Sequence, residues 1–394
     1  MSSRAFLGSV GFLSFATVYN NLVVSPVIVE IARDMGVTVG TAGLLVTAYG
    51  IPGIVVGILA GPLSDRYGRK GFLVGGGAVM SVLTLLGAAA PGFAHLLLTR
   101  VGAGVGAAVL FPNLTAAVAD EFPYQQRGRA MGFVIAMNSM APIVGVPLAG
   151  LIAGLTSWRL SFVAVGVLGL LAVGVVSRSR LIGPAVRQTE LGTRELFSSI
   201  LGDISVRGAV VSSMFGSVFW FAWITYVVAF FVERFGLSTA TASLVILLTG
   251  VGIVIGSQVG GRIGDRTGHK AVVGWTILVG SVLMLIETVV VHDLVLAIMV
   301  LLLLALATGA RFATNTAMIS ELAPEARGTM LAINSSIVSV GIVAGTAIGG
   351  ILVDSYGYEA LGVMSALAGL AAAFVVWRFV TERTADIAAG EAID

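Results

Sequence analysis

The chain has 394 residues, of which 57% are hydrophobic and only 11% are charged, and its formal net charge is +2. Since a soluble domain usually carries about 25% charged residues, this chain has too few charges for a water-facing surface, and we predict an integral membrane protein. The basic residues are scattered through short turns, which argues against nucleic-acid binding, and the absence of cysteine excludes disulfides and cysteine-based metal sites.

Apolar runs of roughly 20 residues can each cross a bilayer as a helix. The chain contains twelve such runs, which predict an all-α membrane protein with twelve transmembrane helices. In the first half they span 5–29, 41–62, 71–90, 95–117, 129–154 and 160–177. In the second half they span 208–232, 240–261, 271–291, 294–317, 328–352 and 359–380. The first run is longer than a signal-peptide core and no cleavage pattern follows it, so we expect it to be the first spanning helix.

These helices define four parts of the chain. Two six-helix halves, residues 1–177 and 208–380, are separated by a polar, arginine-containing linker at 178–207 and followed by a tail at 381–394. We expect a short amphipathic helix within the linker and no fixed structure in the tail.

The basic residues predict the orientation of these helices. Most of them fall on the side that contains the N-terminus, the linker and the tail, whereas only Arg33, Arg159 and Arg234 fall on the other side. Cytoplasmic loops of membrane proteins carry an excess of Lys and Arg. We therefore expect both termini and the linker to be cytoplasmic, in a multi-pass protein of the plasma membrane of a prokaryote.

A charged turn after the second predicted helix is repeated in the second half of the chain. Gly-Pro-Leu-Ser-Asp-Arg-Tyr-Gly-Arg-Lys at 61–70 is followed two hundred residues later by Gly-Arg-Ile-Gly-Asp-Arg-Thr-Gly-His-Lys at 261–270. The register matches Gly61 with Gly261, Asp65 with Asp265, Arg66 with Arg266, Gly68 with Gly268 and Lys70 with Lys270. Such a repeat indicates a duplicated unit, and two repeated membrane halves are typical of transporters.

The 61–70 turn resembles the signature loop of the major facilitator superfamily, and the degenerate copy, the two halves and the linker agree with that family. The resemblance implies two six-helix halves related by pseudo-two-fold symmetry and transport by alternating access. It also implies that the two turns, including Arg69, latch the cytoplasmic side when the protein faces outward. We expect Asp65→Asn to weaken that latch and reduce transport while leaving folding largely intact.

Two further motifs bear on the branch of the family. Arg100, followed by glycines in the fourth predicted helix, resembles the family's buried arginine. The fifth predicted helix resembles the motif of twelve-helix drug:proton antiporters, through Pro142, Gly145, Pro147 and Gly150. It departs from that motif because Ala141 and Val146 stand where glycines are expected.

Polar and charged residues inside the bilayer are costly and are therefore candidates for function. Arg100 is expected to face the central cavity or, alternatively, to be a structural arginine bonded to carbonyls. Arg311 is expected to bind an anionic substrate group or to snorkel to the cytoplasm. By helix position in the family, the candidates for the substrate cavity are Tyr19, Asn20, Asn21, Arg100, Asn113, Asn138, Phe219, Trp223, Tyr226, Arg311, Asn315 and Asn334.

The aromatic members of this set, Phe219, Trp223 and Tyr226, share one face of the seventh predicted helix. They predict an apolar cavity wall that tolerates cations. Packing against lipid is the alternative.

No Asp or Glu stands in the middle of helices one, four, five, seven or ten, although proton relays need such groups. Glu287 is the only carboxylate that we expect within the membrane, and we expect it to snorkel to the outer surface. Interfacial ion pairs or, alternatively, an extracellular gate are expected from Glu30, Arg33 and Asp34 after the first helix and from Glu233 and Arg234 after the seventh. The possible coupling acids are Glu30, Asp34, Glu233 and Glu287.

The resulting hypothesis is a secondary active transporter, with efflux of apolar or amphipathic small molecules as a multidrug:proton antiporter. The alternative is an uncoupled or proton-coupled carrier of an anionic metabolite or lipid. An enzyme or receptor is disfavoured because the three histidines, His95, His269 and His292, are far apart in the sequence. We expect a monomer in the lipid bilayer that binds a small-molecule substrate, uses a proton gradient and needs no cofactor, metal or nucleic acid.

Overall fold

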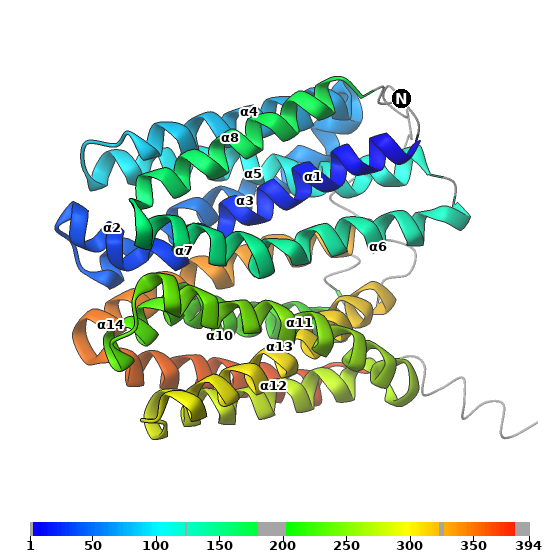
Figure 1. Cartoon of the computed structure of the whole chain (residues 1–394). Helices are drawn as coiled ribbons and strands as arrows, with labels where there is room; N and C mark the ends of the chain where they lie inside the picture. The colour runs from blue at the N-terminus through cyan, green and yellow to red at the C-terminus, as the bar shows by residue number, and fades with distance from the viewer. Residues whose placement is uncertain (1–2, 123, 180–201, 323–326, 383–394) are drawn as a thin grey trace, which may run out of the picture. The chain divides into compact units, whose positions relative to one another are not determined.

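The structure, a computed structural model, describes residues 3–122, 124–179, 202–322 and 327–382. Most of the predicted linker, including its proposed amphipathic helix, and almost all of the predicted tail lie outside these residues. Figure 1 shows that the described chain is built from long helices.

In the first half of the chain, the described residues form eight helices. They are α1 (Ser3–Leu22), α2 (Ile28–Met35), α3 (Val39–Tyr67), α4 (Arg69–Ala88), α5 (Phe93–Glu121), α6 (Tyr124–Met140), α7 (Val146–Leu155) and α8 (Trp158–Ser177). A 3₁₀ turn, Ser25–Val27, connects α1 to α2, and a π-helical turn, Ala141–Gly145, connects α6 to α7.

The part of the second half that the structure describes forms five long helices. They are α10 (Ile204–Phe235), α11 (Thr239–Thr267), α12 (His269–Leu285), α13 (Leu294–Leu322) and α14 (Arg327–Phe379). α12 continues into a π-helical turn, Ile286–Val290.

The twelve predicted spans can be traced in the described residues. Ten helices are long and apolar enough to cross a membrane, and residues 5–22 with 25–35 form an eleventh span if that bent pair is counted as one. α14 is one of the ten, and Gly357, with a φ of 80°, divides it into the two helices predicted at 328–352 and 359–380.

The first predicted helix and the charged turns differ from expectation. The helix expected at 5–29 ends at Leu22, and the chain bends by 40° before α2 at a turn that contains Pro26, which lacks an amide hydrogen. The turn at 61–70 is almost entirely helical, because α3 extends to Tyr67 and α4 begins at Arg69. Only Gly68, with a φ of 94°, breaks the helix, and Gly268 repeats this with a φ of 91°.

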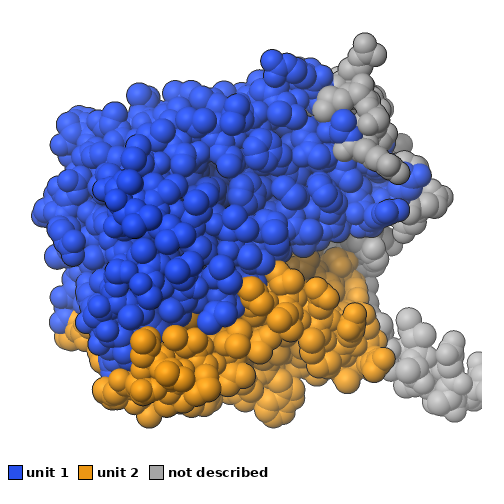
Figure 2. All heavy atoms as spheres, viewed as in Figure 1, with its two compact units in different colours: residues 1–188, 224–250, 346–355 blue, residues 189–223, 251–345, 356–394 orange. Residues whose placement is uncertain are grey.

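The described chain forms two compact units, coloured separately in Figure 2. Unit 1 contains residues 1–188, 224–250 and 346–355, and unit 2 contains residues 189–223, 251–345 and 356–394. The units do not coincide with the two halves of the sequence, because two segments of the second half belong to unit 1.

Close backbone packing holds each unit together. In unit 1, α5 packs on α3 and α4, and a Cβ at Gly104 would overlap the main chain of Tyr49. In unit 2, Gly256 of α11 lies against the main chain of Leu306 in α13. Small residues allow membrane helices to approach this closely, where van der Waals packing is the main attraction between them.

Candidate functional site

Arg100 lies in the interior of unit 1, with a side chain that is 0% exposed. Its NH1 group donates to the side-chain oxygen of Asn20 at 3.0 Å and to the Asn20 carbonyl at 3.3 Å, and its Nε donates to the Leu45 carbonyl at 3.5 Å. The guanidinium carbon lies 4.1 Å from the centroid of the Tyr49 ring, a cation–π distance. Arg100 therefore joins α5 to α1 and α3, as the structural alternative describes.

The other polar candidates of unit 1 also have local contacts. The amide nitrogen of Asn20 donates to Thr84 at 2.7 Å, and that of Asn113 donates to the Val109 carbonyl at 2.7 Å. Asn138 accepts a hydrogen bond from Ser14 at 2.5 Å, and Tyr19 is buried, whereas Asn21 is partly exposed. Several of these polar groups are thus used to join helices within the unit.

The three aromatic candidates fall into two different environments, although all three are buried. Phe219 and Trp223 belong to unit 2, where the Phe219 ring lies against Gly280 and Gly369. Tyr226 belongs to unit 1. The common face that the sequence predicts is therefore divided between the packing of two units.

Arg311 of unit 2 is 3% exposed. Its NH2 group donates to the Gly216 carbonyl at 3.1 Å, whereas its buried Nε has no hydrogen-bond partner among the described residues. One turn further along α13, Asn315 donates to Ser213 at 3.0 Å. Arg311 therefore does not snorkel to the surface. Asn334, on α14, is partly buried.

The helix-five motif forms the π-helical turn Ala141–Gly145 and the first turns of α7. Pro142 removes one amide donor from the helical ladder, and a π turn accommodates such a break. A Cβ at Gly145 would overlap the Tyr19 ring, and a Cβ at Gly150 would overlap the Ser243 side chain of α11. The motif thus provides glycine surfaces on which α1 and α11 pack within unit 1.

One end of unit 1, where α3 and α11 begin, carries side chains that the sequence interpretation missed. We call it the capped end and define it by Thr38, Gly40, Thr239 and Asp354. Asp354 of α14 accepts hydrogen bonds from the Gly40 amide at 2.8 Å and the Thr38 hydroxyl at 2.5 Å. Glu30 of α2 accepts a hydrogen bond from the Thr239 hydroxyl.

The sequence feature that could have indicated the capped end is a repeated helix N-cap. Thr38 accepts from the amide of Thr41 at 3.1 Å, and Ser238 accepts from the amide of Thr241 at 3.1 Å, two hundred residues later. Ser and Thr are strongly preferred at such N-cap positions. The pattern places the starts of α3 and α11 but does not identify the carboxylates that cover them.

The two repeated turns make matching contacts within their own units. Arg69, the first residue of α4, forms an ion pair with Asp120 at the end of α5. At the equivalent position in unit 2, His269 lies 3.3 Å from Glu321 at the end of α13. In each unit the turn is thus tied to the end of the helix that follows α4 or α12.

Further contacts tie both turns to the segments that follow the helical halves. Lys70 donates to the carbonyl of Ser179 at 3.0 Å. The main-chain amide of Lys270 donates to Glu382 at 2.6 Å. Asp265 and Arg266 are exposed.

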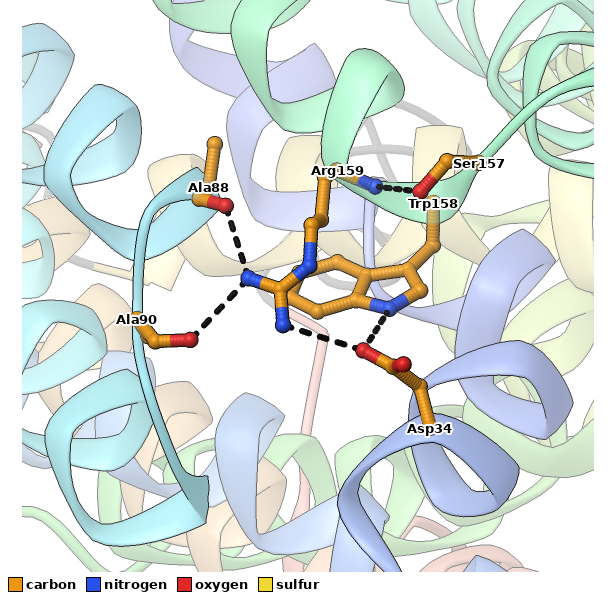
Figure 3. A network of polar contacts seen from close by, with 6 residues as sticks. All are labelled: Asp34, Ala88, Ala90, Ser157, Trp158 and Arg159. Carbon is orange, nitrogen blue, oxygen red and sulfur yellow. Dashed lines mark hydrogen bonds and ion pairs between the residues drawn. The ribbon is translucent and has the colours of Figure 1, made fainter.

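Asp34, a candidate coupling acid, belongs to a network of polar contacts at the end of α2 (Figure 3). One of its carboxylate oxygens accepts from the Trp158 indole nitrogen and from Arg159, each at 3.0 Å. Arg159 also donates to the carbonyls of Ala88 and Ala90, at 2.9 and 3.0 Å. The network connects α2, the end of α4 and the start of α8. In it, Asp34 pairs with Arg159.

Glu287 differs most from expectation among the candidate acids. It lies in the π-helical turn after α12 and is 0% exposed, so the expectation that it snorkels to the surface is wrong. The expectation rested on the position of Glu287 near the outer end of its predicted helix, and that position alone does not determine whether a side chain is buried. Glu233 lies near the end of α10, and Glu30 lies at the capped end.

Comparisons with known proteins identify the family. The model of the Major Facilitator Superfamily matches residues 9–301 and 208–392. Multidrug resistance protein 2 of Bacillus subtilis (strain 168) is 26% identical over 84% of this chain and 84% of its own length. The inner membrane transport protein YdhP of Escherichia coli (strain K12) is 27% identical over 86% of this chain and 87% of its own.

Solved structures support the same fold. The crystal structure of a D-xylose-proton symporter has a TM-score of 0.79 at 16% identity and covers 97% of this chain and 99% of that one. A bacterial homolog of the human lysosomal transporter Spinster has a TM-score of 0.75 at 17% identity, covering 96% of each chain. This protein is a transporter rather than an enzyme, and the chain belongs to the Major Facilitator Superfamily.

Proposed function

We propose that the protein exports apolar or amphipathic small molecules in exchange for protons, by alternating access across a prokaryotic plasma membrane. The observation that carries this proposal is the helix-five motif, whose glycines provide close packing surfaces for α1 and α11. The motif resembles that of drug:proton antiporters. Relatives include proteins named for multidrug, chloramphenicol and quinolone resistance, at 26 to 29% identity.

The orientation belongs to the same proposal. The excess of basic residues on the side of the N-terminus favours cytoplasmic termini. The two charged turns would then lie at the cytoplasmic ends of their helices, and the capped end would face the outside. We propose that the turns form the cytoplasmic latch and that the small-molecule substrate is bound by a monomer without a cofactor.

Glu287 and Glu30 are the best-supported coupling acids within this proposal. Ionisable side chains inside the bilayer are rare, and they are candidates for proton relays by default. Glu287 is fully buried, and one carboxylate oxygen of Glu30 is buried without a hydrogen-bond partner among the described residues. Asp34 is less suited to this role, because its carboxylate is used by Trp158 and Arg159.

The test uses purified protein in liposomes with an inward proton gradient and a pH indicator in the lumen. A panel of lipophilic cations is added first, and a panel of organic anions is added to a separate sample. Proton movement evoked by a cation, and absent from protein-free liposomes, supports the proposal. Cation flux without proton movement contradicts the coupling, and no cation flux at all contradicts the substrate class.

A carrier of anionic substrates is the second candidate, and Arg311 is the observation that favours it. A buried guanidinium has five donors, and Nε has no partner among the described residues. An anionic group could satisfy it. Flux of a labelled organic anion that is lost in Arg311→Gln but retained in the surface variant Arg178→Gln would favour this candidate.

A further inference from the structure

The capped end of unit 1 contains three successive contacts between helices of the first half and residues 224–250 and 346–355 of the second half. At the rim, Asp354 of α14 lies on the first turn of α3, where it accepts from the Gly40 amide at 2.8 Å and the Thr38 hydroxyl at 2.5 Å. The first amides of a helix have no partner within the helix, and they attract a negative charge. The carboxylate of Asp354 therefore ties α14 to α3.

The second contact is made by Tyr226 of α10, which is 0% exposed. Its ring fills the space beside Gly43 and Gly350, where a Cβ on either glycine would meet the phenol. Its hydroxyl donates to the Thr346 carbonyl at 2.8 Å. Tyr226 thus fills the gap between α3 and α14 just below the rim.

The third contact lies deeper along the same helices. The hydroxyls of Thr47 in α3 and Thr346 in α14 are 2.7 Å apart and buried. Since a helix rises about 1.5 Å per residue, Thr47 lies roughly 10 Å below Gly40. The three contacts form one continuous seam from the exposed rim inward.

We propose that Asp354 and Tyr226 are positioning residues that hold this end of the transport path closed. Asp354 acts through the helix terminus that it covers, and Tyr226 acts by filling the seam. Thr47 and the residues beside it stay buried as long as the three contacts persist. The contacts must therefore break whenever the path opens at this end. The opening of the path at this end and the assignment of this end to the outside both rest on the proposed function.

The two repeats differ at this point in a way that supports the assignment to Asp354. The position equivalent to Asp354 is Gly154, and the position equivalent to Gly40 is Ala240. A Cβ at Gly154 would lie 3.1 Å from the Ala240 amide nitrogen, so the equivalent contact is made by close packing alone. Of these two equivalent helix contacts, the one at Asp354 therefore includes a charged cap and the one at Gly154 does not.

Thiol labelling tests the proposal without a substrate or a proton gradient. The chain has no cysteine, so Thr47→Cys introduces a single reporter below the rim. A membrane-impermeant maleimide is applied either outside intact cells or to inside-out vesicles. We expect Asp354→Ala and Tyr226→Phe each to raise the outside labelling rate about fivefold, the population shift that loss of one helix cap or buried hydrogen bond produces.

Matched controls isolate the seam. Asp293 also caps a helix N-terminus, because it accepts a hydrogen bond from the Leu296 amide at 2.9 Å. Unlike Asp354, it caps the helix that it precedes, α13, and joins no second helix through this bond. Tyr356 is 74% exposed. In the Thr47→Cys background, Asp293→Ala and Tyr356→Phe are expected to leave the labelling rate unchanged. Asp354→Asn, which retains the shape and removes the charge, replaces the alanine variant if that variant fails to fold.

Equal outside labelling rates in well-folded Asp354, Tyr226 and control variants would overturn the proposal. An increase confined to reagent on the side of the termini would also overturn it. If cations evoke no proton movement in the Asp354, Tyr226 and control variants alike, but the labelling rates still shift, the proposed function is contradicted. The role of Asp354 and Tyr226 in the seam is then still supported.

Discussion

Arg100 of α5 donates hydrogen bonds to both the main-chain carbonyl and the side-chain oxygen of Asn20 in α1. The same asparagine donates its amide hydrogen to Thr84 of α4 at 2.7 Å. Three helices of unit 1 are therefore joined through one asparagine. The cluster has no exposed member, since Asn20, Thr84 and Arg100 are each at most 1% exposed.

The first prediction concerns this asparagine. Asn20→Leu is nearly isosteric but leaves the Arg100 guanidinium with fewer acceptors in a buried position. Losing a hydrogen bond to a charged group costs about 1.5 to 3 kcal/mol. We expect a corresponding loss of stability, measured as a lower midpoint of thermal unfolding in detergent.

Asn21→Leu is the control for this experiment, because Asn21 is the next residue in α1 and is partly exposed. We expect its stability to change by less than about 0.5 kcal/mol. Equal destabilisation by the two substitutions would show that Asn20 has no special part in supporting Arg100.

The second prediction concerns the glycines of the helix-five motif. An alanine inside a helix is usually more stable than glycine by about 1 kcal/mol. Gly150→Ala, however, introduces a methyl group where the Ser243 side chain lies, so we expect α7 and α11 to separate and transport to fall at least tenfold. The measurement is the initial rate of substrate-evoked proton movement in liposomes.

Gly132 offers the matched control, because nothing lies near a Cβ at that position of α6. Gly132→Ala is expected to retain the transport rate and to raise stability slightly. If Gly150→Ala transports as fast as Gly132→Ala, close packing at the motif is not required for transport.

The third prediction concerns the turn that follows α3. Arg69 pairs with Asp120, and both side chains are partly exposed, at 18% and 33%. A partly exposed ion pair of this kind contributes about 1 kcal/mol. We expect Arg69→Asp and Asp120→Arg each to reduce transport by placing like charges together, and the double substitution to restore most of it.

The double substitution distinguishes the pair from two independent residues. Transport measured for the four proteins gives a coupling energy, which is zero when the residues act separately. Purely additive losses would therefore show that the Arg69–Asp120 contact does not support the turn. The same assay applies to Asp65→Asn, for which we expect reduced transport by folded protein.

The sequence predicted some features of this molecule well for a physical reason. Spanning helices can be predicted from local composition. The repeated turn indicates where Gly68 and Gly268, both with positive φ, interrupt the helices. Contacts between distant helices do not follow from composition. The sequence left open whether Asn20 and Arg100 face a cavity or have a structural role, and it could not show that they bind each other.

Asp354 shows the same limit at the capped end. It follows a predicted span as an ordinary boundary charge, and its partner Gly40 is 314 residues away in the sequence. Glu287 was misjudged because it lies near the end of its predicted helix, whereas its side chain is fully buried. The polar pairings between helices, rather than the helices themselves, are therefore what the structure adds.

The fourth prediction separates a structural acid from a coupling acid. Asp34 is bound to Trp158 and Arg159, and an asparagine can still accept from either donor. We expect Asp34→Asn to lower stability by less than about 1 kcal/mol, as for an exposed ion pair, and to retain exchange of substrate for protons. Glu287→Gln, by contrast, removes a fully buried ionisable group.

We expect Glu287→Gln to abolish substrate-evoked proton movement while substrate equilibrates down its own gradient. The two readings, lumenal pH and labelled substrate, are taken on the same liposomes so that loss of coupling is separated from loss of folding. Retained proton movement in Glu287→Gln would rule out this carboxylate and direct attention to Glu30. Loss of proton movement in Asp34→Asn would instead identify Asp34 as a coupling acid and contradict its purely structural role.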